Sequence, residues 1–204
     1  MGNWSRLVFI VALAQPGTSS KHLKTLRSHN ACMEAKLSLL PFRQLKKLVS
    51  MFPCGRGRSS MIDDDIITDL ARAMPKLEHL QFRISPCETP AGVTVKGLAV
   101  LAYYCPHLSN LCVRFQVAGI DPSEIPQATP SDEPTSLRED CALTFLRVGD
   151  IYVPEESTLM VALTLLRIFP RLNNIIYNNP RWEKVAYAIR VSKKLVDHSS
   201  KKHI

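Results

Sequence analysis

The chain has 204 residues, of which 46% are hydrophobic, and a formal net charge of +8. This composition is typical of a folded protein, and no run reaches the roughly eighteen apolar residues that a membrane span requires. The positive charge lies at the ends: residues 61–180 carry nine Lys or Arg against fifteen Asp or Glu, whereas residues 1–60 carry ten against one. No nucleic-acid-binding signature accompanies the basic ends, so we expect neither a nucleic-acid nor a membrane partner.

Residues 1–40 form a basic N-terminal segment without a clear structural pattern. Within it, residues 7–14 (LVFIVALA) are apolar and end in small residues, which is typical of a short signal peptide. A buried first strand and the remnant of a longer protein's start are the alternative interpretations. Leu23 and Leu26 are three residues apart, as in the repeat described next, and indicate a degraded earlier unit. Residues 31–40 are expected to form a short helix.

A recurring pattern organises the centre of the chain. The stretches 67–82, 98–115 and 163–177 each contain an apolar helical run followed by Pro-x-Leu-x-x-Leu/Ile-x-apolar. Apolar residues at helical spacing predict a helix, proline ends it, and the alternating residues that follow predict a half-buried strand. The aligned positions are Pro75, Pro106 and Pro170, then Leu77, Leu108 and Leu172, then Leu80, Leu111 and Ile175, then Phe82, Val113 and Tyr177.

A helix, a break and a strand that recur in this way are typical of a leucine-rich-repeat solenoid. Weaker copies of the pattern occur at residues 45–48 and 143–148, so residues 41–180 are predicted to form the repeat domain. The expected fold class is α/β, with units of about 30 residues and a parallel sheet on the concave face. Three unrelated helices, each followed by a strand, are the alternative.

Acidic and capping residues mark the predicted helix starts. Asp63, Asp64 and Asp65 precede the helix of the second unit, where carboxylates complement the helix dipole. A metal site is the alternative, although consecutive helical residues point in different directions. Thr94 is expected to cap the next helix, and Gly97 to weaken the first turn of that helix.

The C-terminal half contains one insertion and two predicted helices. Residues 116–140 carry a proline at every fourth position from 122 to 134, and are expected to form an extended or disordered loop or an arm that contacts a partner. A helix is predicted over residues 154–169. Residues 181–204 are predicted to comprise a capping helix that ends near Val196, with a polar outer side, and a polar tail.

No familiar catalytic or metal-binding motif occurs in the sequence. The six cysteines lack Cys-x-x-Cys spacing, the six histidines lack a partner at metal-ligand or nucleophile spacing, and no glycine-rich nucleotide signature is present. We therefore expect a protein that is not an enzyme and that needs no cofactor or metal. The cysteines are expected to be free thiols.

A binding surface is predicted from the strand halves of the repeats. Their anchors point into the core, so the residues between the anchors face outward on the concave side. Arginines on neighbouring strands would recognise carboxylates or phosphates through their planar fork, and simple solvated strand faces are the alternative. The candidate partner-binding residues form a first column of Gln81, Cys112, Arg147 and Ile176 and a second column of Arg83, Arg114, Gly149 and Asn178.

The repeats resemble the leucine-rich-repeat portion of fungal F-box proteins. The similarity is carried by residues 66–80 (IITDLARAMPKLEHL), 99–111 (AVLAYYCPHLSNL) and 165–175, and it extends over roughly residues 40–194. In that family an F-box binds the Skp1 adaptor of a cullin ubiquitin ligase, and the repeats hold the protein substrate. The resemblance implies a substrate-recognition module located in the cytoplasm or nucleus.

One part of the family pattern is missing. No Leu-Pro-x-Glu-Ile/Leu segment of the F-box type precedes Leu40, so a Skp1/cullin complex is expected only if an F-box is present in the full-length protein. If residues 7–14 are a signal peptide, the alternative function is that of a secreted or surface leucine-rich-repeat binding protein.

Overall fold

The computed structural model of the chain describes residues 25–29, 43–52, 62–84, 92–117 and 141–200. These residues form an α/β fold with one parallel sheet, which confirms the predicted class. In chain order the elements are β1 (Thr25–His29), β2 (Lys47–Phe52), α1 (Asp64–Ala73), β3 (His79–Ile84), α2 (Val95–Tyr104), β4 (Asn110–Cys112), β5 (Phe145–Gly149), the short 3-10 helix η4 (Glu155–Ser157), α3 (Thr158–Ile168), β6 (Asn174–Tyr177) and α4 (Arg181–Ser200).

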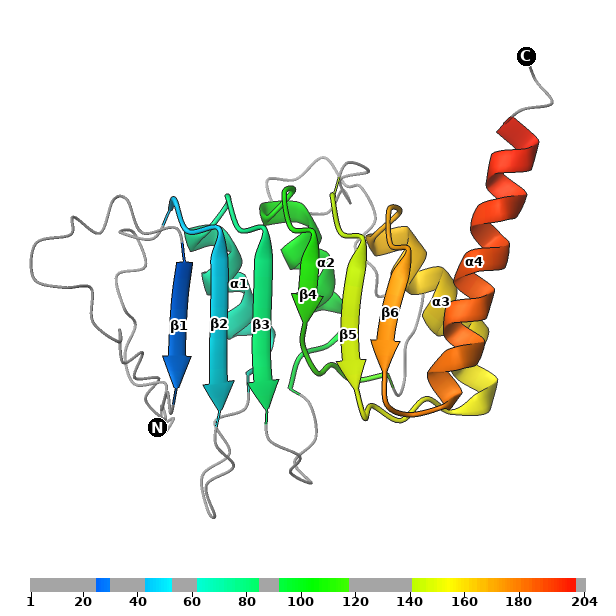
Figure 1. The fold of residues 1–204 in the computed structure, drawn as a ribbon, viewed down its shortest axis with the longest axis horizontal. Helices are drawn as coiled ribbons and strands as arrows, with labels where there is room; N and C mark the ends of the chain where they lie inside the picture. The colour runs from blue at the N-terminus through cyan, green and yellow to red at the C-terminus, as the bar shows by residue number, and fades with distance from the viewer. Residues whose placement is uncertain (1–24, 30–42, 53–61, 85–91, 118–140, 201–204) are drawn as a thin grey trace, which may run out of the picture.

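The six strands lie in the sheet in the order in which they occur in the sequence, and each pairs in parallel with the next. Figure 1 shows α1, α2 and α3 behind this sheet, with α4 beyond β6 at its last edge. Parallel neighbours require a connection that returns the chain to the same end of the sheet, and α1, α2 and α3 lie on three such connections. The predicted apolar column is in register, because the ladder pairs Leu26, Leu48, Leu80, Leu111, Leu146 and Ile175 in succession.

The three connecting helices end just before a proline, as predicted. α1 ends at Ala73, α2 at Tyr104 and α3 at Ile168, each two residues before the proline. The residue between helix and proline has a φ of −127°, −118° and −128° in the three cases. With ψ values of 61°, 68° and 78°, these residues lie outside the helical region, which a following proline disfavours. The helix therefore cannot continue, and the chain turns back toward the sheet.

A single backbone carbonyl near the start of each strand accepts two N–H groups from the next unit. The Glu78 carbonyl accepts from the N–H groups of Ser109 and Asn110, with N to O distances of 2.8 and 3.1 Å. The carbonyls of Lys46, Ser109 and Thr144 make the same pair of bonds to their own next unit. This arrangement recurs at four successive steps, so the units enter the sheet in one common geometry. We call it the double-acceptor step.

The core lies between the inner face of the sheet and the connecting helices. Leu80 and Leu111 enter it from the strands, and Ile67 and Leu98 from the helices, with at most 1% of each residue exposed. Burial stabilises the fold by about 1.5–3 kcal/mol for each such side chain. The apolar periodicities of the sequence thus build one continuous layer.

Trp182 closes the core at the α4 end. Its side chain is fully buried and packs edge to face against Phe115, with ring centroids 6.0 Å apart. Its indole N–H donates to the carbonyl of Ile151 at 2.8 Å, so the polar atom of this large ring is satisfied.

The helix starts are confirmed and are also connected to each other. The Asp63 side chain caps α1 by accepting from the N–H of Ile66 at 2.9 Å. The Asp64 carboxylate accepts from the N–H of Thr94 at 2.7 Å and from its hydroxyl at 2.5 Å, while Thr94 caps α2. Gly97 has a role beyond the predicted weakening of α2, because a Cβ there would lie 2.3 Å from Asp64 Oδ1. The glycine therefore makes room for the Asp64 carboxylate.

Two boundary predictions need correction. The helix predicted over residues 154–169 begins as η4 and becomes α3 only at Thr158, because Pro154 itself has an extended ψ of 143°. The last helix continues past Val196 to Ser200.

Among the residues that the structure describes, no helix combines the length and hydrophobicity needed to span a membrane.

The predicted polar outer side of α4 is only partly correct. Tyr187 and Leu195 are 63% and 65% exposed, and Val191 lies between them at 37%. Positions four residues apart lie on one helix face, so these three side chains form an apolar line on the exposed side of α4.

Several predictions fall outside the described residues. They are the signal-like run 7–14, the short helix 31–40, and residues 118–140 of the insertion. Of the insertion, only Gln116 and Val117 are described, and Val117 is buried.

Candidate functional site

Alternate side chains of the strands point away from the helices and form a surface that we call the open face. They alternate with the buried leucines because successive side chains of a strand point to opposite sides of the sheet. Most of them are half-buried, and three near the β6 edge are exposed. From β2 to β6 the open face comprises Lys47, Val49, His79, Gln81, Asn110, Cys112, Phe145, Arg147, Asn174 and Ile176.

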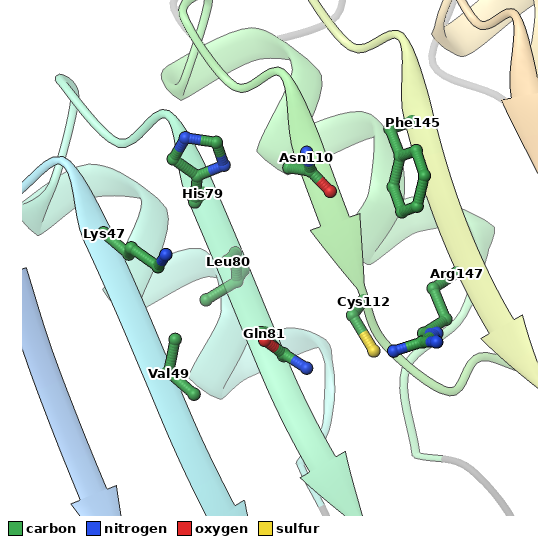
Figure 2. A pocket seen from close by; sticks show the side chains of 9 residues that line it. All are labelled: Lys47, Val49, His79, Leu80, Gln81, Asn110, Cys112, Phe145 and Arg147. Atoms are coloured by element: carbon green, nitrogen blue, oxygen red, sulfur yellow. The ribbon is translucent and has the colours of Figure 1, made fainter. Parts of the chain in front are cut away.

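The structure brings the first predicted column together. Gln81 lies opposite Cys112, Cys112 opposite Arg147, and Arg147 opposite Ile176 in the ladder. Neighbouring strands are about 4.8 Å apart, so the four side chains form a continuous row across the sheet. Figure 2 shows the side chain of Arg147 extending toward Cys112.

The second predicted column does not form such a row. β4 ends at Cys112, and its pairing with β3 ends there too. Phe115 instead forms a bridge with Val93, in the segment that leads into α2. Arg114 is therefore on a stretch that has left the ladder, and it does not lie opposite Arg83.

The remaining members of the second column are displaced by an irregularity in β5. Between Arg147 and Gly149 the register shifts, so Gly149 lies opposite Tyr177. Gly149 has a φ of 64°, which favours glycine and marks the bend. Asn178 lies beyond β6 and donates its N–H to the Gly149 carbonyl at 2.9 Å. The side chain of Arg83 is outside the described set.

Sequence reasoning missed a second row of open-face residues. Lys47, His79, Asn110 and Phe145 are successive ladder partners, two positions before the members of the first row. A detectable signal was present, because the alternation that places Gln81 outside also places the residue before each buried leucine outside. The sequence prediction applied the alternation only to the residue that follows each leucine and not to the residue that precedes it.

The two rows surround a shallow depression of about 240 Å³ on the open face (Figure 2). Its lining combines the amides of Gln81 and Asn110, the ring of Phe145, and a cationic side chain at each end, Lys47 and Arg147. Amides donate and accept hydrogen bonds, whereas Phe145 offers apolar contact area. The depression is therefore suited to contact with a chain of mixed character.

The charge of this depression is positive. Among the described residues, the side chains of Lys47 and Arg147 make no hydrogen bond or ion pair, and no carboxylate lines the depression. Elsewhere cations are paired, as in Lys46 with Glu78 at 2.5 Å. The Lys46 hydrogen bond lowers the pKa of the Glu78 carboxyl below its usual value. The two cations of the open face are thus available for an external anion.

The described cysteines differ in environment. Cys105 is buried, and its thiol lies 3.5 Å from the Met74 carbonyl. Burial, with a smaller contribution from Cys141, raises the pKa of the Cys105 thiol to about 12. Cys112 is half-buried on the open face. No group of three or more His, Cys, Asp or Glu side chains suited to a metal ion occurs within the described ranges.

No family model matches the sequence, and no curated protein matches it.

Proposed function

We propose that the protein is a leucine-rich-repeat solenoid that binds another protein on its open face and carries out no chemistry itself. Three features support a repeat architecture: the sequential order of the parallel strands, the shared apolar column, and the recurring double-acceptor step. In a solenoid each unit contacts mainly its neighbours, and the exposed strand faces together form an extended binding surface.

The row from Gln81 to Arg147 is the observation that carries this function. It places an amide, a thiol and an unpaired guanidinium on one accessible surface, built by consecutive units. Arginine at such a position recognises carboxylates through two parallel hydrogen bonds. A surface of this size and chemical variety suits a polypeptide better than a small molecule, because the depression is shallow and has no enclosed apolar pocket.

The resemblance to F-box proteins supports one specific role for this binding. The repeats would hold a protein substrate for ubiquitin transfer, with a Skp1/cullin complex recruited only where the full-length protein carries an F-box. A secreted or surface binding protein is the alternative, and it depends on residues 7–14 acting as a signal peptide.

Affinity capture with quantitative mass spectrometry tests the proposed surface. Arg147→Glu reverses the charge at residue 147 on the open face, whereas Arg167→Glu makes the same change at an exposed position in the last turn of α3, on the helix side. We expect partners of the native protein to be lost from Arg147→Glu and retained by Arg167→Glu. Equal recovery of every partner by both variants would show that the open face is not the binding surface.

The two roles are separated by the same capture and by location. Skp1 and cullin among the captured proteins would support the ligase role, provided that the tagged chain is in the cytoplasm or nucleus. Recovery of the tagged chain from the medium, with its N-terminal segment removed, would support the secreted alternative.

A further inference from the structure

Two cations that make no hydrogen bond or ion pair with the other described residues define the ends of a track across the open face. Lys47 is on β2 and Arg147 on β5, so three strand spacings separate them, or about 14 Å. Successive ladder pairs place Lys47 in register with Phe145 on β5. Arg147 lies two residues after Phe145, which is about 7 Å further along the strand. The Cα atoms of the two cationic residues are therefore about 16 Å apart along a diagonal.

The groups between the two cations match an extended backbone. Gln81 and Asn110 line the track and present side-chain amides, which both donate and accept hydrogen bonds. An extended peptide has N–H and C=O groups free to pair with such amides. A helix has already satisfied its own backbone groups, so it would leave these amides without a match. The ring of Phe145 beside them offers a contact for one apolar side chain.

We propose that the open face binds an extended acidic segment of a partner protein, in which two carboxylates pair with Lys47 and Arg147 and an apolar side chain between them contacts Phe145. An extended chain advances about 3.3 Å per residue and its alternate side chains share one side, so the two carboxylates would be about four or six residues apart. This proposal rests on the function proposed above and specifies the chemistry of the partner.

A nucleic acid is a less suitable occupant of the same track. Its phosphates would also attract Lys47 and Arg147, but residues 61–180 carry fifteen acidic against nine basic residues. This net negative charge disfavours a long polyanion more than a short segment with two carboxylates, because each added phosphate adds to the repulsion.

Fluorescence anisotropy with defined probes tests this proposal on the full chain. The probes are labelled Gly/Ser peptides with two glutamates four or six residues apart and one leucine between them on the same side of the extended chain. Control peptides replace both glutamates with lysine or place them side by side, and a single-stranded oligonucleotide of equal charge serves as the nucleic-acid probe. Arg167→Glu is the matched protein control, and circular dichroism verifies that each variant is folded.

We expect the spaced glutamate peptide to bind at least about tenfold more tightly than the lysine and adjacent-glutamate peptides. Lys47→Glu and Arg147→Glu should each weaken it by about tenfold or more, whereas Arg167→Glu should leave it unchanged. Arg147→Glu should also gain affinity for a peptide in which one glutamate is replaced by lysine. Equal binding of all peptides, or tighter binding of the oligonucleotide, would overturn the proposal.

The result also separates this proposal from the proposed function. If partner capture depends on Arg147 while acidic peptides bind no better than lysine peptides, the open face binds proteins but the acidic chemistry is wrong. If acidic peptides bind as expected while capture is identical in native protein and Arg147→Glu, the face has the chemistry but not the proposed role.

Discussion

Replacing Gly97 with alanine should have opposite effects on stability in two backgrounds. Gly97 lies in the first turn of α2, where a Cβ would come within 2.3 Å of Asp64 Oδ1. The Asp64 carboxylate is held there by two hydrogen bonds from Thr94. In the native background, the new methyl group must push this carboxylate away. In an Asp64→Ala background the carboxylate is absent, and the methyl group meets only the end of the Val93 side chain, with Cγ1 3.1 Å away.

The magnitudes follow from these contacts. Two hydrogen bonds to a half-exposed carboxylate together stabilise the fold by about 1.5–3 kcal/mol, and alanine is favoured over glycine inside a helix by about 1 kcal/mol. Gly97→Ala should therefore destabilise the native protein by about 0.5–2 kcal/mol and stabilise the Asp64→Ala variant by about 0.5–1 kcal/mol. Asp64→Ala alone should cost about 1.5–3 kcal/mol.

Urea unfolding followed by circular dichroism measures the four free energies of this double-mutant cycle. Asp65→Ala is the matched control, because Asp65 is exposed in the same first turn of α1 and makes no bond to Thr94. We expect the control to combine additively with Gly97→Ala, within about 0.5 kcal/mol. If Gly97→Ala changes stability by the same amount, and in the same direction, with Asp64 present and absent, the Asp64 carboxylate is not what requires glycine at position 97.

Four further predictions concern the core and the thiols. Trp182→Phe should destabilise the fold by about 2–4 kcal/mol in urea unfolding, because it leaves the Ile151 carbonyl without its donor and creates a cavity. Leu111→Ala, at the centre of the apolar column, should cost about 2–5 kcal/mol in the same assay. At pH 8.5 a thiol reagent should label Cys112 at least about a hundredfold faster than Cys105, as read by peptide mass spectrometry, because only a thiolate reacts. The folded-state pKa of Cys105 is raised from 9.0 to about 12, so its contribution to stability is present below pH 9 and is lost as pH rises toward 12.

Each of these predictions has a matched control. Tyr187→Phe and Ile176→Ala change exposed side chains and should shift stability by less than about 0.5 kcal/mol. Comparable losses in these controls would show that burial is not the cause. Equal labelling rates for the two cysteines in the folded protein would contradict the burial of Cys105. If stability depends on pH above pH 9 in the same way in Cys105→Ala as in the native protein, the effect does not come from the Cys105 thiol.

The sequence predicted the frame of the fold because the frame depends on local patterns. A proline disfavours the helical conformation at the residue before it wherever it stands, and leucines that recur with the strand period share one face of the sheet. These two constraints gave the helix ends and the column through Leu80 and Leu111, including the earlier unit marked by Leu26.

The candidate site was predicted only in part because its limits are set by distant contacts. β4 has three residues because Phe115 leaves the ladder to bridge Val93 and to pack against Trp182, which lies 67 residues later in the chain. No local sequence pattern around Arg114 predicts that the chain leaves the ladder at this point. The role of Gly97 was hidden for the same reason, because the carboxylate it accommodates belongs to the preceding unit.

The double-acceptor step has a consequence for how such a chain can change its length. Between Leu26, Leu48, Leu80, Leu111, Leu146 and Ile175, successive steps are 22, 32, 31, 35 and 29 residues, yet these residues remain in one column. The register of the strands is fixed by a few backbone hydrogen bonds at the strand starts. The length of the segment that connects one strand to the next, here called the return, therefore does not affect it. Residues can therefore be gained or lost in the returns by mutation, or grafted there by an engineer, while the arrangement of the open face is preserved.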